Sequence, residues 1–206
     1  MGFHALQAAR RVGSTGRVIA VEMMPRNCDL LRASVRINGF SHVTVHQVAA
    51  AERAQTISYC HPRGSGNGTL ASSYIRDLAQ TGCFASPQTA QAVAVDDLLP
   101  PELRIHLVKM DVEGAEMGAL RGMDRLFRTQ RPTLVFEFYP HLLRNVGGVE
   151  PVELLDAIRS YGYEVRSIDG RGVPAAAQLN NDQAMALAAS ETQHEYIDLI
   201  AVPTGQ

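Results

Sequence analysis

The stretch Ile105-His-Leu-Val-Lys-Met110, followed directly by Asp111-Val-Glu-Gly-Ala-Glu116, decides the fold class. The first six residues form an apolar run of the kind found in a buried strand, and the next six hold three carboxylates close together. A helical pattern then continues through Phe127. A buried strand, an acidic turn and a helix in this order predict one unit of an α/β fold with a parallel sheet.

The same alternation of strands and helices extends in both directions from this segment. Helical patterns cover residues 3–12, 25–38 and 152–161. Runs typical of strands cover residues 17–21, 43–48, 55–59, 133–138, 163–168 and 196–202. We therefore expect one domain over residues 1–206, built on a mostly parallel, doubly wound sheet with helices on both faces.

The composition limits the classes of partner and location. The formal net charge is −2, and the Lys and Arg residues are scattered, so we expect no nucleic-acid partner. Cys28, Cys60 and Cys83 are an odd number without close spacing, which is typical of reduced thiols. No apolar run approaches the roughly 20 residues that span a bilayer, so we expect a soluble, cytoplasmic protein without membrane contact.

Two stretches interrupt the alternation. Residues 61–73 are rich in glycine and predict a long loop, for which a functional role and an ordinary surface role both remain open. The alanine-rich stretch from Ala175 to Ala189 is typical of a variable insertion.

Polar side chains near the carboxyl ends of the strands are the candidates for chemistry, because open parallel sheets bind ligands there. Glu22 follows the first predicted strand, where a carboxylate can accept hydrogen bonds from both ribose hydroxyls or simply begin a helix. Asp111 is a candidate base or metal ligand. Glu137 lies inside an apolar strand, where an acid needs a partner. His141 follows four residues later and is either a base or a surface histidine.

The order of these motifs resembles the FkbM family of methyltransferases. The most specific match is Leu107-Val-Lys-Met-Asp-Val-Glu-Gly-Ala-Glu-Met-Gly-Ala-Leu-Arg-Gly122, which is similar to the family's hydrophobic strand, D-V-E-G-A-E turn and helix. Gly16-Arg-Val-Ile-Ala-Val-Glu22, Val95-Asp-Asp-Leu98 and Phe136-Glu-Phe-Tyr-Pro-His141 support it in the family's order. The resemblance covers the chain from Gly2 to about Val202.

The resemblance implies a class I, Rossmann-like methyltransferase fold with S-adenosylmethionine as methyl donor. It also implies O-methylation of a small-molecule hydroxyl, on a sugar, a polyketide or a similar compound. Carried over, Glu22 holds the ribose hydroxyls, and Gln47 and Ala49 border the adenine.

The remaining roles fall at the reacting end of the site. By resemblance, Asp111 lies near the methionine end and the transferred methyl, while Glu137 and His141 line the acceptor side and the loop 61–73 shapes the acceptor pocket. Asp111 or His141 is the expected base. A divalent cation on Asp111 is an alternative way to lower the pKa of the acceptor hydroxyl, although the histidines do not show metal-ligand spacing.

The chain departs from the family pattern at its start, where the first strand is absent and Gly2 stands in what remains of the glycine-bearing cofactor turn. Because that strand is central in the class I order, we expect two strands with unpaired facing edges. An upstream start, a rearranged sheet and a partner that fills the gap remain open. A catalytically silent methyltransferase-like fragment or interaction domain is the alternative function, and a nicotinamide-dependent oxidoreductase is a weaker one.

Overall fold

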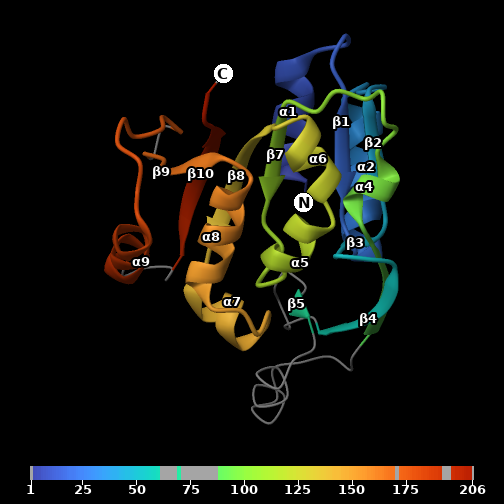
Figure 1. Cartoon of the computed structure of the whole chain (residues 1–206). Coiled ribbons are helices and arrows are strands. Elements are labelled where there is room, and N and C mark those ends of the chain that lie inside the picture. Colours follow the sequence, from blue (N-terminus) through green and yellow to red (C-terminus); the bar gives the residue numbers. More distant parts are fainter. Residues whose placement is uncertain (1, 61–68, 71–87, 170–171, 192–195, 206) are drawn as a thin grey trace.

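The computed structural model describes residues 2–60, 69–70, 88–169, 172–191 and 196–205 (Figure 1). The strands are β1 Val18–Val21, β2 Val43–His46, β3 Ala49–Ala50, β4 Gln55–Cys60, β5 Thr69–Leu70, β6 Gln88–Val93, β7 Leu107–Met110, β8 Thr133–Phe138, β9 Tyr163–Ser167 and β10 Ile197–Pro203. The helices are α1 Phe3–Val12, α2 Pro25–Ile37, α4 Val95–Leu98, α5 Glu116–Arg121, α6 Asp124–Thr129, α7 Pro140–Asn145, α8 Pro151–Ser160 and α9 Asn181–Ser190. None of the helices in these ranges is long and apolar enough to cross a bilayer.

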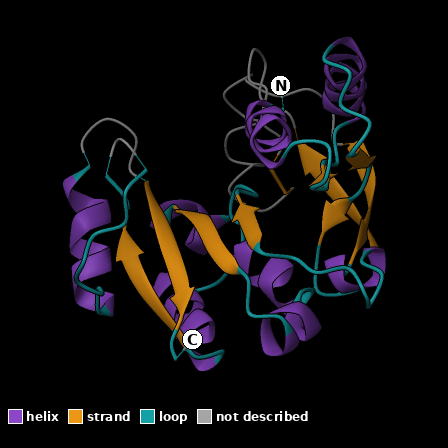
Figure 2. Cartoon of the chain, turned by 90° about the horizontal axis from the view of Figure 1, so that it is seen from above, coloured by secondary structure: helices purple, strands orange, loops and turns teal. Residues whose placement is uncertain are grey.

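The strands form three separate sheets, and helices flank them on both sides (Figure 2). One sheet holds β1 and β2 in parallel. The second runs in the order β7-β8-β10-β9, with β7 and β8 parallel and β10 antiparallel to both its neighbours. The third runs β3-β6-β4-β5 and is mostly antiparallel. The predicted α/β fold is confirmed, although β10 inserts between β8 and β9 in the opposite direction to both.

The expected pair of unpaired edges is present between β1 and β7. Within the described residues, β1 pairs only with β2, and β7 pairs only with β8. Val18 and Glu22 donate their amides to β2-side carbonyls, those of His42 and His46. The side chain of Leu107 on β7 is 57% exposed, which is unusual for an apolar residue on a parallel strand. The two halves that surround the candidate site therefore meet without a shared ladder of hydrogen bonds.

The main hydrophobic core lies under the β7-β8-β10-β9 sheet. Along β8, Leu134, Phe136 and Phe138 are fully buried, while the alternate side chains are half-buried on the other face. This alternation matches the period of two in a strand. α5 and α8 cover the buried face with Leu120, Leu154 and related apolar side chains. One face of β8 therefore packs in the core, and the half-buried side chains of the opposite face can contact a ligand.

Gly122 ends α5 and lets that helix contact the small third sheet. A Cβ at this position would overlap the carbonyl oxygen of Ala51, which follows β3. The helical pattern predicted through Phe127 is therefore divided into α5 and α6 at a glycine. Asp96 of α4 fixes the start of α6, because its carboxylate accepts the amides of Arg125 (2.7 Å) and Leu126 (3.1 Å).

Some local predictions differ from the structure. The strand expected over residues 43–48 stops at His46, and the chain resumes at Ala49 as a strand of a different sheet. Pro140 is the first residue of α7, since proline is tolerated where a helix begins. Thr69 and Leu70 form β5, but the rest of the loop predicted over residues 61–73 lies outside the described residues. The alanine-rich stretch contains α9, which Asn180 caps.

Candidate functional site

Glu22 lies immediately after β1, and its carboxylate is held in place by the start of α2. One oxygen, Oε1, accepts the amide of Met24 at 2.8 Å, and Oε2 accepts the side-chain amide of Asn27 at 3.1 Å. Asn27 is 6% exposed, so its side chain is fixed by packing. A carboxylate has about four acceptor positions, which leaves Glu22 with capacity for two hydroxyl donors.

A cavity of about 240 Å³ lies beside Met23 and Pro25, which follow Glu22 in the chain. Its walls are Met23, Pro25, Gln47, Thr89, Ala90 and Gln91. This volume is below the roughly 300–1,000 Å³ of a pocket that encloses a whole drug-sized ligand, and it suits one ring system. Gln47, predicted to border the adenine, lies in this wall, whereas Ala49 is buried with Ala51 and Ala92 in a small core against which Met23 packs.

Gly2 lies next to the same helix that orients Glu22. Its backbone has a positive φ of 74°, and a Cβ there would overlap the side chain of Leu31. Leu31 is one helical turn beyond Asn27 on α2 and is buried. Gly2 therefore lies against α2, the helix whose start holds Glu22, and its positive φ favours glycine at this position.

A second group of polar side chains lies on the free face of the β7-β8-β10-β9 sheet. Met110 pairs with Phe136 in the register of β7 and β8, so Asp111 follows opposite Glu137. Across the next pair, Glu137 stands opposite Asp198 of β10. Lys109 forms ion pairs with Asp198 and Asp111, with its Nζ 2.8 Å from Asp198 Oδ1 and 3.7 Å from Asp111 Oδ2. We call Asp111, Glu137 and Asp198 the acid row.

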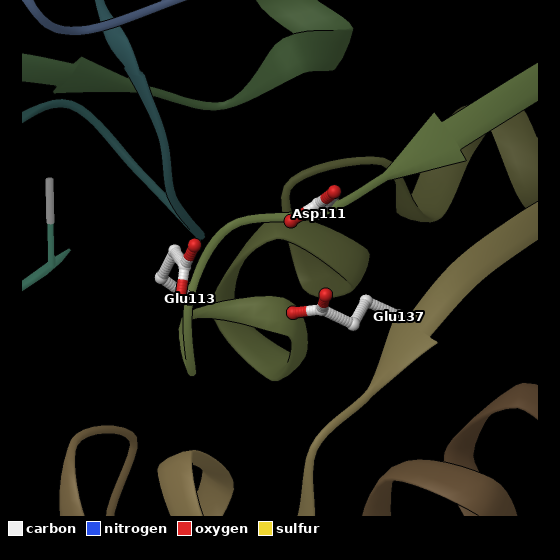
Figure 3. Close-up of side chains that lie close together, drawn as sticks. All are labelled: Asp111, Glu113 and Glu137. Carbon is white, nitrogen blue, oxygen red and sulfur yellow. The ribbon is translucent and has the colours of Figure 1, made fainter. Parts of the chain in front are cut away.

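Glu113 joins this group from the turn between β7 and α5. One carboxylate oxygen each of Asp111, Glu113 and Glu137 lies within 4.8 Å of the others (Figure 3). The turn brings Glu113 toward the end of β8, while the other two side chains come from neighbouring strand ends. Three oxygens at this separation can hold a hard divalent cation, or can share a proton.

Burial and neighbouring charge change the acidity of this group. Burial, and to a smaller extent the charges of Asp111 and Glu113, together raise the pKa of Glu137 from 4.5 to about 8. Lys109 opposes the shift more weakly. The pKa of the Tyr196 hydroxyl is also raised, first by burial and then by Glu137 and its neighbours. Glu137 is thus a carboxyl group that exchanges a proton near neutral pH.

His141 lies on α7, at one end of a row of rings. Its ring centroid is 6.2 Å from that of Tyr139, which is 5.8 Å from that of Tyr196. The His141 side chain is exposed, and its Nδ1 faces the side-chain amide of Asn145 at 3.2 Å. His141 therefore belongs to a group of neighbouring rings with Tyr139 and Tyr196, whereas carboxylate oxygens of Asp111, Glu113 and Glu137 lie within 4.8 Å of one another.

The arrangement has counterparts among known proteins. The profile described as "Methyltransferase FkbM domain" matches residues 2–165. The chain belongs to the FkbM methyltransferase family. It is 29% identical over 121 residues to "Methyltransferase 1" of Beauveria bassiana, covering 52% of this chain and 49% of that protein. It is similar in fold to a solved FkbM methyltransferase from Methylobacillus flagellatus, with a TM-score of 0.54 and 17% identity, over 97% of this chain and 40% of the other.

These comparisons also bear on the extent of the FkbM chain. It spans about half the length of the curated relative and less than half of the solved structure. The structural likeness at 17% identity supports the fold alone.

The sequence did not predict that Lys109 and Asp198 lie beside Asp111 and Glu137 in the candidate site. A lysine inside the apolar run of β7 was a visible signal, since an unpaired charge in a strand is costly. Asp198 gave no such signal, because its place depends on β10 pairing antiparallel to β8. The Val95-Asp-Asp-Leu98 segment, by contrast, has an evident structural task in Asp96, which caps α6.

Proposed function

We propose that this chain binds S-adenosylmethionine and transfers its methyl group to a hydroxyl of a small molecule, such as a sugar or a polyketide. The observation that carries this proposal is the carboxylate of Glu22, which is oriented at the end of β1 by Met24 and Asn27 and is followed in the chain by Met23 and Pro25 of a ring-sized cavity. Nucleotide-binding α/β folds use an acid in this position for ribose hydroxyls. Bound S-adenosylmethionine supplies a methyl group already activated by its sulfonium.

On the donor side, the residues have binding tasks. Glu22 accepts the two ribose hydroxyls, and Gln47 with the neighbouring cavity wall takes the adenine ring. Gly2 borders the methionine portion, where backbone without a Cβ allows close approach. In this proposal Ala49 acts on the adenine only indirectly, because Met23 of the cavity wall packs against the small core that contains Ala49.

On the acceptor side, the residues position a hydroxyl and take its proton. Glu137 is the base that the electrostatics favour, because its pKa is raised to about 8 and its carboxylate is therefore a stronger proton acceptor than an ordinary one. Asp111 and His141, expected from the sequence, remain candidates for the same step. A cation held by Asp111, Glu113 and Glu137 is the alternative way to acidify the acceptor.

Calorimetric titration with S-adenosylhomocysteine tests the proposal, with NAD⁺ as the comparison ligand. Saturable binding of S-adenosylhomocysteine alone supports the donor assignment and justifies a screen of hydroxyl acceptors with methyl-labelled donor. A folded chain that binds neither ligand contradicts the proposal. Preference for NAD⁺ favours the oxidoreductase alternative.

A non-catalytic interaction domain is the second candidate. The observation that favours it is that, among the described strands, β1 and β7 each have one edge without a partner, since exposed strand edges are templates for pairing with another chain. Folding without donor binding, together with self-association, is the result that this candidate predicts.

A further inference from the structure

Glu116 is the most deeply buried acid near the site, and it faces the turn instead of solvent. Glu116 is only 2% exposed to solvent. Oε1 accepts the backbone amides of Val112 at 3.3 Å and Gly114 at 3.2 Å. Oε2 is buried and has no hydrogen-bond partner among the described residues. Burying a carboxyl group that is only partly hydrogen-bonded lowers the stability of the fold. We therefore ask what the two hydrogen bonds from the backbone to Glu116 do.

The turn that Glu116 holds has an uncommon backbone. Glu113 has a φ of 53° and Gly114 a φ of 98°, so two successive residues lie in the left-handed half of conformational space. A non-glycine residue there is uncommon and persists only where the surroundings impose it. The bonds from Val112 and Gly114 to Glu116 bracket Glu113 on both sides, and they fix the direction of its side chain.

The same turn is packed against the segment that follows the acid row. A Cβ on Gly114 would come within 2.8 Å of the carbonyl oxygen of Leu142 on α7. A Cβ on Gly147, just after α7, would overlap the carbonyl oxygen of Gly114. Backbone therefore meets backbone at this contact, and the position of the turn is coupled to α7, which follows β8 and Glu137.

We propose that Glu116 is a positioning residue: its buried carboxyl locks the turn at residues 112–114 so that Asp111 and Glu113 face Glu137. Glu116 acts through backbone amides and needs no contact with donor or acceptor. The link to methyl transfer rests on the proposed function, whereas the geometric role does not.

Two replacements separate this role from a simple effect of charge. Glu116→Gln keeps an acceptor oxygen at the same reach, while Glu116→Met keeps the length and removes the strong acceptor. Both remove the carboxylate, so any difference between them reports the hydrogen bonds to Val112 and Gly114. The double variant Asp111→Asn, Glu113→Gln gives the reference, because it neutralises the two acids beside Glu137 and keeps the Glu116 carboxylate and the backbone amides that it accepts.

The measurement is the titration of the Glu137 carboxyl by ¹³C NMR, which requires neither donor nor acceptor. We expect E116Q to lower the Glu137 pKa only slightly, through the lost charge of Glu116, and E116M to lower it further, by roughly one unit or more, in the direction of the reference variant. A role in folding alone would lower the melting temperature of E116M and leave the pKa of Glu137 unchanged, which would overturn the proposal.

A second measurement keeps the proposal testable if E116M does not fold. In the wild-type chain, the amides of Val112 and Gly114 are expected to be protected from hydrogen exchange by Glu116. Fast exchange of both would overturn the proposal without any variant. Failure of the chain to bind S-adenosylhomocysteine would count against the proposed function only, because neither readout involves the donor.

Discussion

Asp111, directly after β7, lies opposite Glu137 of the parallel strand β8, and one oxygen of each carboxylate lies within 4.8 Å of the other. Two acids at this distance, one of them half-buried, resist simultaneous ionisation. The nearby Lys109 is shared between Asp111 and Asp198, so its charge only partly compensates. The consequence is a proton that Glu137 keeps until the pH is well above the usual range of a carboxyl group.

This relationship predicts a pH-dependent stability. Glu137 has a pKa of about 8 in the folded state and about 4.5 when unfolded, so the folded state binds more protons between these values. Stability therefore falls as the pH rises from 4.5 to 8. The full shift corresponds to about 5 kcal/mol, and solvent screening of this partly exposed group reduces the expected effect to roughly 1–2 kcal/mol.

Glu137→Gln removes this loss, so the variant should melt at a higher temperature than the wild type at pH 8 and at the same temperature near pH 4.5. Thermal unfolding followed by circular dichroism across this range measures the difference. Glu164→Gln is the matched control, because Glu164 lies on β9 and pairs with Arg166 at 2.7 Å. A constant offset between E137Q and wild type at all pH values would contradict the assignment.

The sequence predicted those parts of the site that follow from local pattern. Glu22 was found because an acid directly after an apolar strand lies at a ligand-binding edge, and Glu137 because an acid inside an apolar strand is expensive. The acid row as a unit was not predictable. It depends on which strands pair and in which register, and these choices are made by long-range packing of α5, α8 and β10.

Glu116 illustrates the same limit. The sequence does not show how deeply each of the three acids in this turn is buried, yet Asp111 is exposed, Glu113 is half-buried and Glu116 is fully buried. The difference comes from the left-handed backbone at Glu113 and Gly114, which turns consecutive side chains in unrelated directions. Hydrophobic periodicity contains no information on such a turn.

A second prediction concerns Glu22 and the donor. Glu22→Gln exchanges one acceptor oxygen for an amide donor that faces Asn27 and the expected ribose hydroxyls. We expect affinity for S-adenosylhomocysteine to fall by roughly 10- to 100-fold, the effect of about one or two lost hydrogen bonds to a charged group. Calorimetric titration measures it.

Asp29→Asn is the control for this prediction, because Asp29 is an exposed acid on α2, the helix whose start holds Glu22, and it forms an ion pair with Arg32 at 3.6 Å. Equal loss of affinity in both variants would indicate a general electrostatic effect and would contradict a specific role for Glu22.

A third prediction uses two glycines of one helical segment. Gly122→Ala places a methyl group on the carbonyl of Ala51, so the helix or β3 must move, and we expect a loss of roughly 2–4 kcal/mol in unfolding free energy. Gly118→Ala meets nothing closer than the amide nitrogen of Glu52 at 3.9 Å. This change should stabilise the chain by up to about 1 kcal/mol through helix propensity. Urea unfolding distinguishes the two, and similar midpoints would contradict the close contact of α5 with β3.

The last prediction concerns the facing edges of β1 and β7. In a parallel pair, the backbone groups of alternate residues point to opposite sides. Val18 and Glu22 donate toward β2, so Ile19 and Val21 direct their amides to the open edge. On β7, His106 accepts from Thr133 of β8, so Leu107 and Lys109 face the other way.

Residue-resolved hydrogen exchange should therefore show an alternating pattern. We expect the amides of Ile19, Val21, Leu107 and Lys109 to exchange roughly 100-fold or more faster than those of Ala20, Val108 and Met110. The alternation is the decisive feature, because local unfolding of either strand would expose all its amides equally. Uniform protection along both strands would mean that another segment or another molecule pairs with these edges in solution, and mass measurement of the native species would then tell the two apart.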